Sequence, residues 1–206
     1  MSEQMSVTRA LAELKTLDAR IAKAIIAPFV EMTIGGKVLG SNRSVDEARG
    51  DIKSSFQSYE DLVKRRNAIK CAIVKSNAET KVVIGKTEMY VSEAIERKNS
   101  IAFDEQLINN MRAQLRIAIG KVEKTNVDAN TRLNQMLEVN LGKDRKTTEE
   151  DYAAIAKPFM AKNEAALVDP LNIEKLINEL QEKVDEFKLN VDFALSEINA
   201  VTKITV

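Results

Sequence analysis

The sequence predicts a mainly α protein, in which long antiparallel helices form a helical bundle or coiled-coil hairpins and carry a small β element. Three observations predict it. Seven Gly and three Pro among 206 residues leave few helix breakers. Apolar residues recur at spacings of three and four over long stretches. Short alternating or β-branched segments occur at 29–39, 81–84 and 202–206. One helical domain over 1–206 is expected.

The first third of the chain predicts helix, hairpin, helix. Ser6 can cap a first helix that Pro28 ends or closely follows. A β-hairpin insertion is expected at 29–43, because alternating residues precede Gly35-Gly36. Ser44 and Glu47 have the spacing of a capping box at the start of a second long helix. The apolar face of the first helix comprises Ala10, Leu14, Leu17, Ile21 and Ile25.

The middle of the chain predicts a short strand, a turn and a very long helix. The strand is "KVVI", 81–84, and Gly85 turns it toward a helix capped by Thr87. This helix is expected to run toward Leu141, with a break around residues 99–100 and Gly142 as its C-terminal cap. Its expected apolar face is Leu107, Met111, Leu115, Ile119 and Val122.

An irregular connector is expected at 142–170, with a short helix that starts at Thr147 or Thr148 and that Pro158 ends or kinks. Asp169-Pro170 is expected to open the last helix. The tail 202–206, "TKITV", is expected to be a strand that closes a small sheet with 81–84 or the 29–39 hairpin.

The last helix carries the most regular apolar repeat of the chain. Its spacings of three and four indicate packing along another helix, in this chain or in a partner. We call the repeat the seam; as an assembly surface it would comprise Ile173, Ile177, Leu180, Val184, Phe187, Val191 and Ile198.

Composition argues against several classes of function. The absence of His removes the commonest general base and metal ligand. Equal numbers of basic and acidic residues, 31 each, give no general attraction to nucleic acid. Cys71 is the single cysteine, and no apolar run has the length of a signal peptide or membrane span. We expect no catalytic, cofactor-binding or metal-binding residues, no nucleic-acid partner and no stable membrane span.

Gly85-Lys86-Thr87 matches the end of a phosphate-binding loop. That loop requires another glycine five residues before Gly85, where the chain has Thr80. Stiff β-branched residues also replace the flexible loop between them. We therefore assign Gly85 and Thr87 to a structural turn. The paired carboxylates Glu93 and Glu96, the basic run 64–66 and Cys71 are interpreted as helix surface or packing residues.

The central stretch resembles the septicolysin-like family of small bacterial and phage proteins. The resemblance rests on an Asn-x-x-Thr segment, a Gly-Lys-Thr turn and a following Glu-Ala-Ile-x-Arg-Lys helix. It also includes the Leu-Ala-Glu-rich opening helix and the helix-to-strand end, although the aromatic residue expected after Asn199 is missing. The family implies an antiparallel helical fold with a small β element. The central residues are Asn77, Thr80, Gly85, Lys86, Thr87, Glu93, Ala94, Ile95, Arg97 and Lys98.

The functional expectation is a non-enzymatic structural protein that works by helix packing and oligomerisation, as a component of a bacteriophage or phage-like virion. It would bind protein partners, as a homo-oligomer or in a larger particle, in the virion or the bacterial cytoplasm. The alternative is a pore-forming or membrane-active protein of the septicolysin-like kind, with "RIAKAIIAPFVEMTI" as the inserting segment. An enzyme would need a carboxylate site that the sequence does not indicate.

Overall fold

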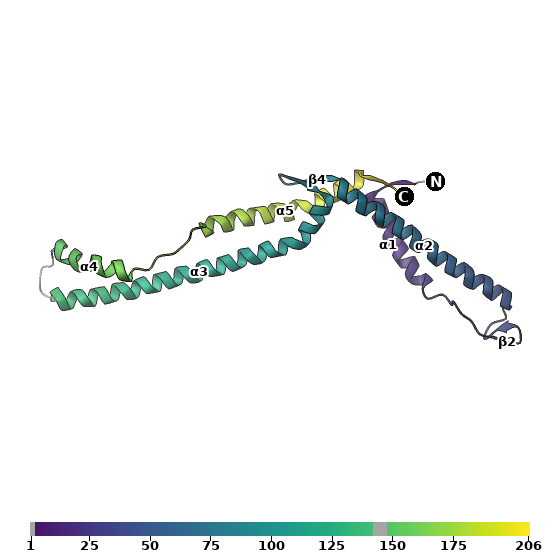
Figure 1. Cartoon of the computed structure of the whole chain (residues 1–206), viewed down its shortest axis with the longest axis horizontal. Coiled ribbons are helices and arrows are strands. Elements are labelled where there is room, and N and C mark those ends of the chain that lie inside the picture. The colour runs from purple at the N-terminus through teal and green to yellow at the C-terminus, as the bar shows by residue number, and fades with distance from the viewer. Residues whose placement is uncertain (1–2, 142–147) are drawn as a thin grey trace. The chain divides into compact units, whose positions relative to one another are not determined.

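The computed structural model describes residues 3–141 and 148–206, and within them the chain is mainly α, with five helices and three two-stranded antiparallel sheets. The expected fold class is confirmed (Figure 1). The chain forms two compact units. The first unit comprises 1–99 and 186–206, and the second comprises 100–185.

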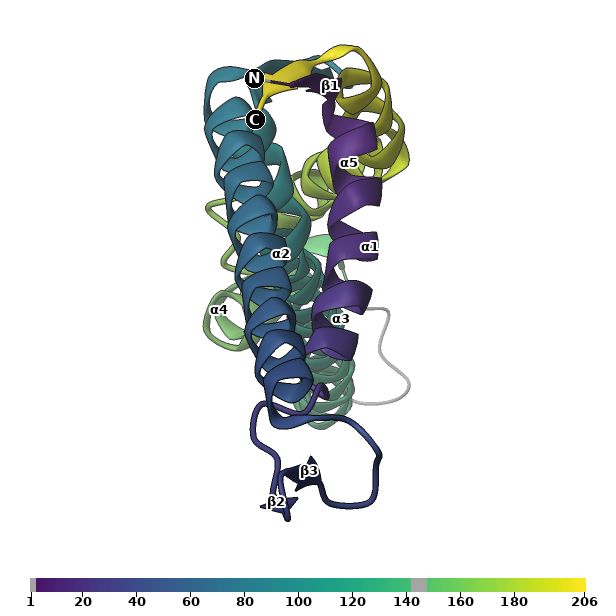
Figure 2. The ribbon, with the colours of Figure 1, turned by 90° about the vertical axis from the view of Figure 1, so that its right-hand side faces the viewer.

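In the first unit, α1 (Val7–Ala24) and α2 (Val45–Glu79) form an antiparallel hairpin (Figure 2). Ser6 caps α1 by accepting the N–H of Arg9, and Ser44 with Glu47 completes the predicted capping box of α2. The two helices share a core because their apolar residues repeat at helical spacing. That core contains Ala10, Leu14, Leu17, Leu62, Ile69 and Ile73.

The two ends of the described chain pair with each other. Strand β1 (Gln4–Ser6) lies antiparallel to β6 (Lys203–Thr205), with Met5 opposite Ile204. Both side chains are buried and extend the core between α1 and α2. The tail is therefore a strand, as expected, but its predicted partners were wrong. The described strands form three separate two-stranded sheets, so the single small sheet that was expected is not formed.

A second hairpin joins α2 to α3. Strand β4 (Lys81–Ile84) has the predicted bounds and pairs with β5 (Thr87–Tyr90), and α3 begins only at Val91. The expected helix cap at Thr87 is therefore wrong, since Thr87 is the first residue of a strand. The Glu93 carboxylate instead accepts the N–H of Tyr90 at the start of α3.

The second unit contains the rest of α3 (Val91–Leu141), α4 (Glu149–Asn163) and the start of α5 (Ile173–Val201). α3 continues without the expected break at 99–100. Its buried residues in this unit are Ile101, Ile108, Ala129 and Leu133, whereas Leu107 and Ile119 of the expected face are exposed. The predicted cap Gly142 and the possible start at Thr147 lie outside the described residues.

The expected connector contains the short helix predicted within it, α4 (Glu149–Asn163). Thr148 caps α4, and Pro158 lies inside this helix, which continues to Asn163. Asn126 of α3 accepts the N–H of Ala165 and donates to the Ala165 carbonyl, which fixes the chain after α4. α5 begins three residues after Pro170, and the Asp169 carboxylate accepts the N–H of Ile173. Asp169 thus lies before α5 and satisfies the first backbone N–H of this helix.

Candidate interaction surfaces

The seam is buried within the chain. In the second unit, Ile177 and Val184 are buried and Ile173 and Leu180 are half-buried; a groove of about 540 Å³ places Ile177 beside Leu115 of α3. In the first unit, Phe187 and Val191 are buried and Ile198 is half-buried.

The ion pair of Lys98 with Asp192 and the Arg97 guanidinium over the Phe187 ring hold α5 against α3 in the first unit. The helix partner that the seam predicts is therefore in this chain. The seven residues of the seam are buried or half-buried within the chain.

The Gly85 turn is part of the core architecture. Gly85 has φ 59°, and Ile84 pairs with Thr87, so Gly85 and Lys86 form a two-residue turn with glycine at its first central position. A Cβ at Gly85 would lie 2.6 Å from the side chain of Glu186 on α5. The positive φ therefore favours glycine here, and any larger residue would also displace the flexible Glu186 side chain. Nothing in it resembles a loop wrapped around phosphates.

A different hairpin presents apolar side chains to solvent. Strands β2 (Thr33–Ile34) and β3 (Lys37–Val38) lie in the segment 25–44 between α1 and α2. We call its exposed apolar residues the tip patch. Ile26 is 82% exposed and Val30 is 86% exposed. The tip patch comprises Ile25, Ile26, Val30, Met32, Ile34 and Leu39.

Alternation along the chain explains which side chains point outward. Val30, Met32 and Ile34 are exposed, whereas Glu31 between them is half-buried and Phe29 lies edge-on to Phe56 of α2, with ring centroids 6.2 Å apart. On β3, Val38 is buried. One set of side chains therefore attaches the hairpin to α2, and the other set is left in solvent.

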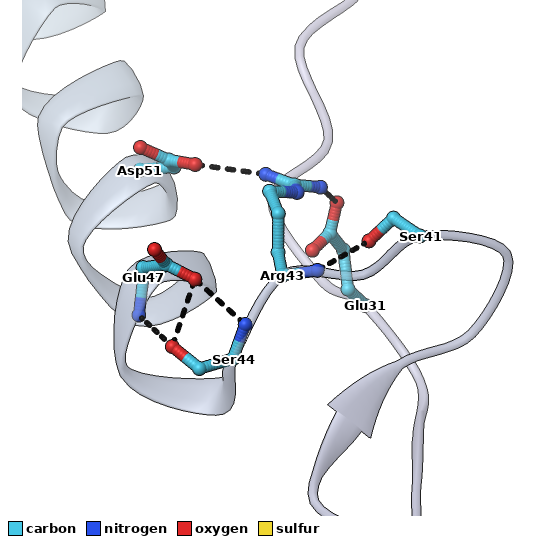
Figure 3. A network of polar contacts seen from close by, with 6 residues as sticks. All are labelled: Glu31, Ser41, Arg43, Ser44, Glu47 and Asp51. Atoms are coloured by element: carbon cyan, nitrogen blue, oxygen red, sulfur yellow. Dashed lines mark hydrogen bonds and ion pairs between the residues drawn. The ribbon is translucent and has the colours of Figure 1, made fainter.

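Arg43 ties this segment to the start of α2. Its guanidinium donates to Glu31 at 2.6 Å and to Asp51 at 2.8 Å, bridging the hairpin strand and the helix (Figure 3). The hydrogen bonds to Asp51 and then to Glu31 raise the pKa of Arg43 above its ordinary value. Glu31 is 14% exposed, and its second carboxylate oxygen is buried without a hydrogen-bond partner. The clamp thus neutralises the one acidic side chain of the hairpin.

A second exposed apolar surface lies on α5 in the first unit. Leu189 and Phe193 are one helical turn apart and are 70% and 72% exposed. We call this pair the α5 stripe. It lies on the side of the helix away from the buried Val191 and Phe187. At 100° per residue, Phe193 stands about 120° from Phe187 and about 160° from Val191, so it lies off the seam.

Few candidate metal-binding, membrane-spanning or ligand-binding features occur in the described part of the chain. No group of three or more potential metal-ligating side chains occurs in 3–141 and 148–206. No helix among those residues combines the length and apolarity needed to cross a membrane. Cys71 is exposed. The groove beside Ile177 is bordered by Arg112, Arg116 and Glu174 and is open to solvent.

Comparisons with family models, curated proteins and solved structures found no match to this chain. The functional reading therefore rests on the geometry of the chain itself.

Sequence reasoning missed the tip patch as a surface, although it predicted the hairpin. The signal was present in "FVEMTI", where Phe29 contacts Phe56 of α2 and Glu31 binds Arg43, whereas Val30, Met32 and Ile34 face solvent. Alternation usually indicates apolar side chains facing inward. Here the inward position belongs to Glu31, because Arg43 and Asp51 complete an ion-pair network with it.

Proposed function

We propose that this chain is a non-enzymatic assembly protein that acts through its exposed apolar surfaces as a component of a larger particle. One observation carries the proposal. Large apolar side chains gather on the surface of the first unit, and Ile26, Val30, Leu189 and Phe193 are each 70% or more exposed. Grouped apolar side chains in solvent are typical of a surface that a neighbouring subunit covers.

The location of the apolar surface supports the same proposal. The seam residues of α5 are buried or half-buried within the chain, so they are not the exposed apolar surface. The tip patch and the α5 stripe remain open. The stripe lies on α5, and the tip patch lies on the connection between α1 and α2, which the Arg43 clamp ties to α2. We propose a bacteriophage or phage-like virion as the particle.

The test is the state of association of the full chain. We expect multi-angle light scattering to show a mass above one chain at high micromolar concentration, or the chain to be recovered within a particle from its source. A single-chain mass at all concentrations, together with absence from any particle, would overturn the proposal. Electron microscopy of the recovered particle distinguishes a virion from another assembly.

A membrane-active function is the second candidate, because the tip patch falls in the segment "IAPFVEMTI". Apolar side chains on a short ordered hairpin can enter the headgroup region without a spanning helix. Leakage of dye from anionic liposomes tests it. We expect no leakage if the tip patch serves assembly, and leakage that an Ile26→Gln change abolishes would favour the membrane function.

A further inference from the structure

We propose that the tip patch of one copy docks on the α5 stripe of a second copy, so that copies join head to tail. This inference rests on the proposed assembly function and names the two contacting surfaces. Both surfaces consist of large apolar side chains that are more than half exposed, and both belong to the first unit. Each lacks a partner within the described part of the chain that would cover it.

The shapes of the two surfaces suit each other. The tip patch lies on the connection between α1 and α2, which the Arg43 clamp joins to the start of α2 (Figure 3). The α5 stripe is a ridge of two side chains one turn apart on a straight helix. Apolar side chains of this kind form the buried centre of a protein interface, with charged side chains at its rim.

Charge favours this pairing over contact of two tips. Lys23 and Lys37 border the tip patch, are exposed and make no ion pair within the described residues. The tip's acid, Glu31, is neutralised by Arg43. On α5, Glu186 and Glu197 lie beside the stripe, about one turn from Leu189 and Phe193, and neither is ion-paired in the described chain. Cationic tips would repel each other, whereas a tip and a stripe attract.

The contact must be intermolecular. α2 has 35 residues and so is roughly 52 Å long at 1.5 Å per residue. The tip precedes its first residue, whereas Glu186 of α5 contacts the Gly85 turn just beyond its last residue. A tip therefore cannot reach the stripe of its own chain. Because two different surfaces meet, the contact is heterologous and repeats into a ring or a filament.

Two variants of the full chain test this geometry. The tip variant carries Ile26→Gln and Val30→Gln; the stripe variant carries Leu189→Gln and Phe193→Gln. All four side chains are largely exposed, so both variants should fold, as circular dichroism verifies. Val74→Gln on α2 is the control, because Val74 is apolar and 58% exposed but lies outside both surfaces. Sedimentation velocity measures association.

We expect the control to associate like the unchanged chain, and each variant alone to associate about tenfold or more weakly. Mixing the two variants should give a one-to-one heterodimer that grows no further, because only one intact tip and one intact stripe remain. Lys37→Glu and Glu197→Lys should each weaken association, and the chain carrying both should recover it.

Other outcomes would overturn the inference. A stripe variant that associates normally would indicate contact between tips or through another surface. An unchanged chain that stays monomeric but binds vesicles through its tip would assign the patch to lipid. A monomeric chain recovered within a particle would leave the assembly function standing and remove this contact between copies. A monomeric chain found in no particle would remove the proposed function as well.

Discussion

The β2–β3 and β4–β5 hairpins have nearly the same turn, but the first precedes α2 and the second follows it. Each has an isoleucine followed by glycine at a two-residue turn, Ile34-Gly35 in one and Ile84-Gly85 in the other. Ile84 is buried and Ile34 is exposed. The turn residues fix a hairpin in both places. What surrounds the hairpin decides whether its apolar residues form core or surface.

Attachment accounts for the difference. The β4–β5 hairpin passes directly from α2 to α3, and the N–H of Val91 closes its base by donating to the carbonyl of Thr80. Val82 and Ile84 then lie in the core. The β2–β3 hairpin is held by Val38, Phe29 and the Arg43 clamp, and its outer side chains have no helix against them. A polar clamp can therefore order a hairpin without burying its apolar face.

Truncating the two isoleucines should separate the hairpins most clearly. Ile84→Ala removes buried volume from the core and should lower the free energy of unfolding by about 3 kcal/mol. Ile34→Ala removes an exposed side chain and should change it by less than about 0.5 kcal/mol. Urea unfolding of both variants measures the difference, and equal losses would contradict the comparison.

Substituting the turn glycines should give a smaller contrast. Gly85→Val forces a β-branched residue to φ 59° and displaces the side chain of Glu186, so we expect a loss of about 2 kcal/mol. Gly36→Val strains a turn with open space around it, at φ 80°.

For Gly36→Val, hydrogen exchange should become faster in β2–β3 while the global unfolding transition barely moves. Lys86→Ala is the control: it should leave the unfolding free energy nearly unchanged. Saturable nucleotide binding that Lys86→Ala abolishes would contradict the structural assignment of this turn.

Removing the Ser44 helix cap should have the smallest effect on the free energy of unfolding. Ser44→Ala removes the side-chain acceptor of the Glu47 N–H and should cost about 1 kcal/mol. The backbone N–H and then the hydroxyl of Ser44 lower the pKa of Glu47 below its ordinary value of 4.5. A lowered folded-state pKa means that this stabilisation is full above pH 4.5 and is lost as the pH falls through the folded-state value.

Comparing the chain with its Glu47→Gln variant measures this pH dependence. The unfolding free energy should favour Glu47 near neutral pH, and the difference should shrink in acid. A difference that is the same at both pH values would show that the Glu47 charge does not stabilise the helix start.

Local patterns predicted most helices and the strand at 81–84, because capping residues and apolar spacing act within a few residues. The start of α3 was placed four residues too early, since the apolar and charged residues after Thr87 suit a helix as well as a strand. β1 could not be predicted from Gln4–Ser6, which has no β-branched residue and becomes a strand only by pairing with β6.

The candidate surfaces were harder to predict than the elements. A heptad repeat shows that a helix has a partner but does not distinguish a partner in the same chain from one in another. The seam therefore suggested assembly, although it lies against α3. The outward face of the tip depends on Arg43 reaching residues eight and twelve positions away, which no local pattern encodes.

The pairing of β1 with β6 also sets an order of events for a newly made chain. Met5 packs in the core with α1 and α2, but its strand partner Ile204 is made 199 residues later. Closing so long a loop is entropically costly, so we expect this pairing to form after the helical hairpin. A chain interrupted before Lys203 would leave the buried end of α1 without its covering strand, open to solvent beside Val7 and Ala10.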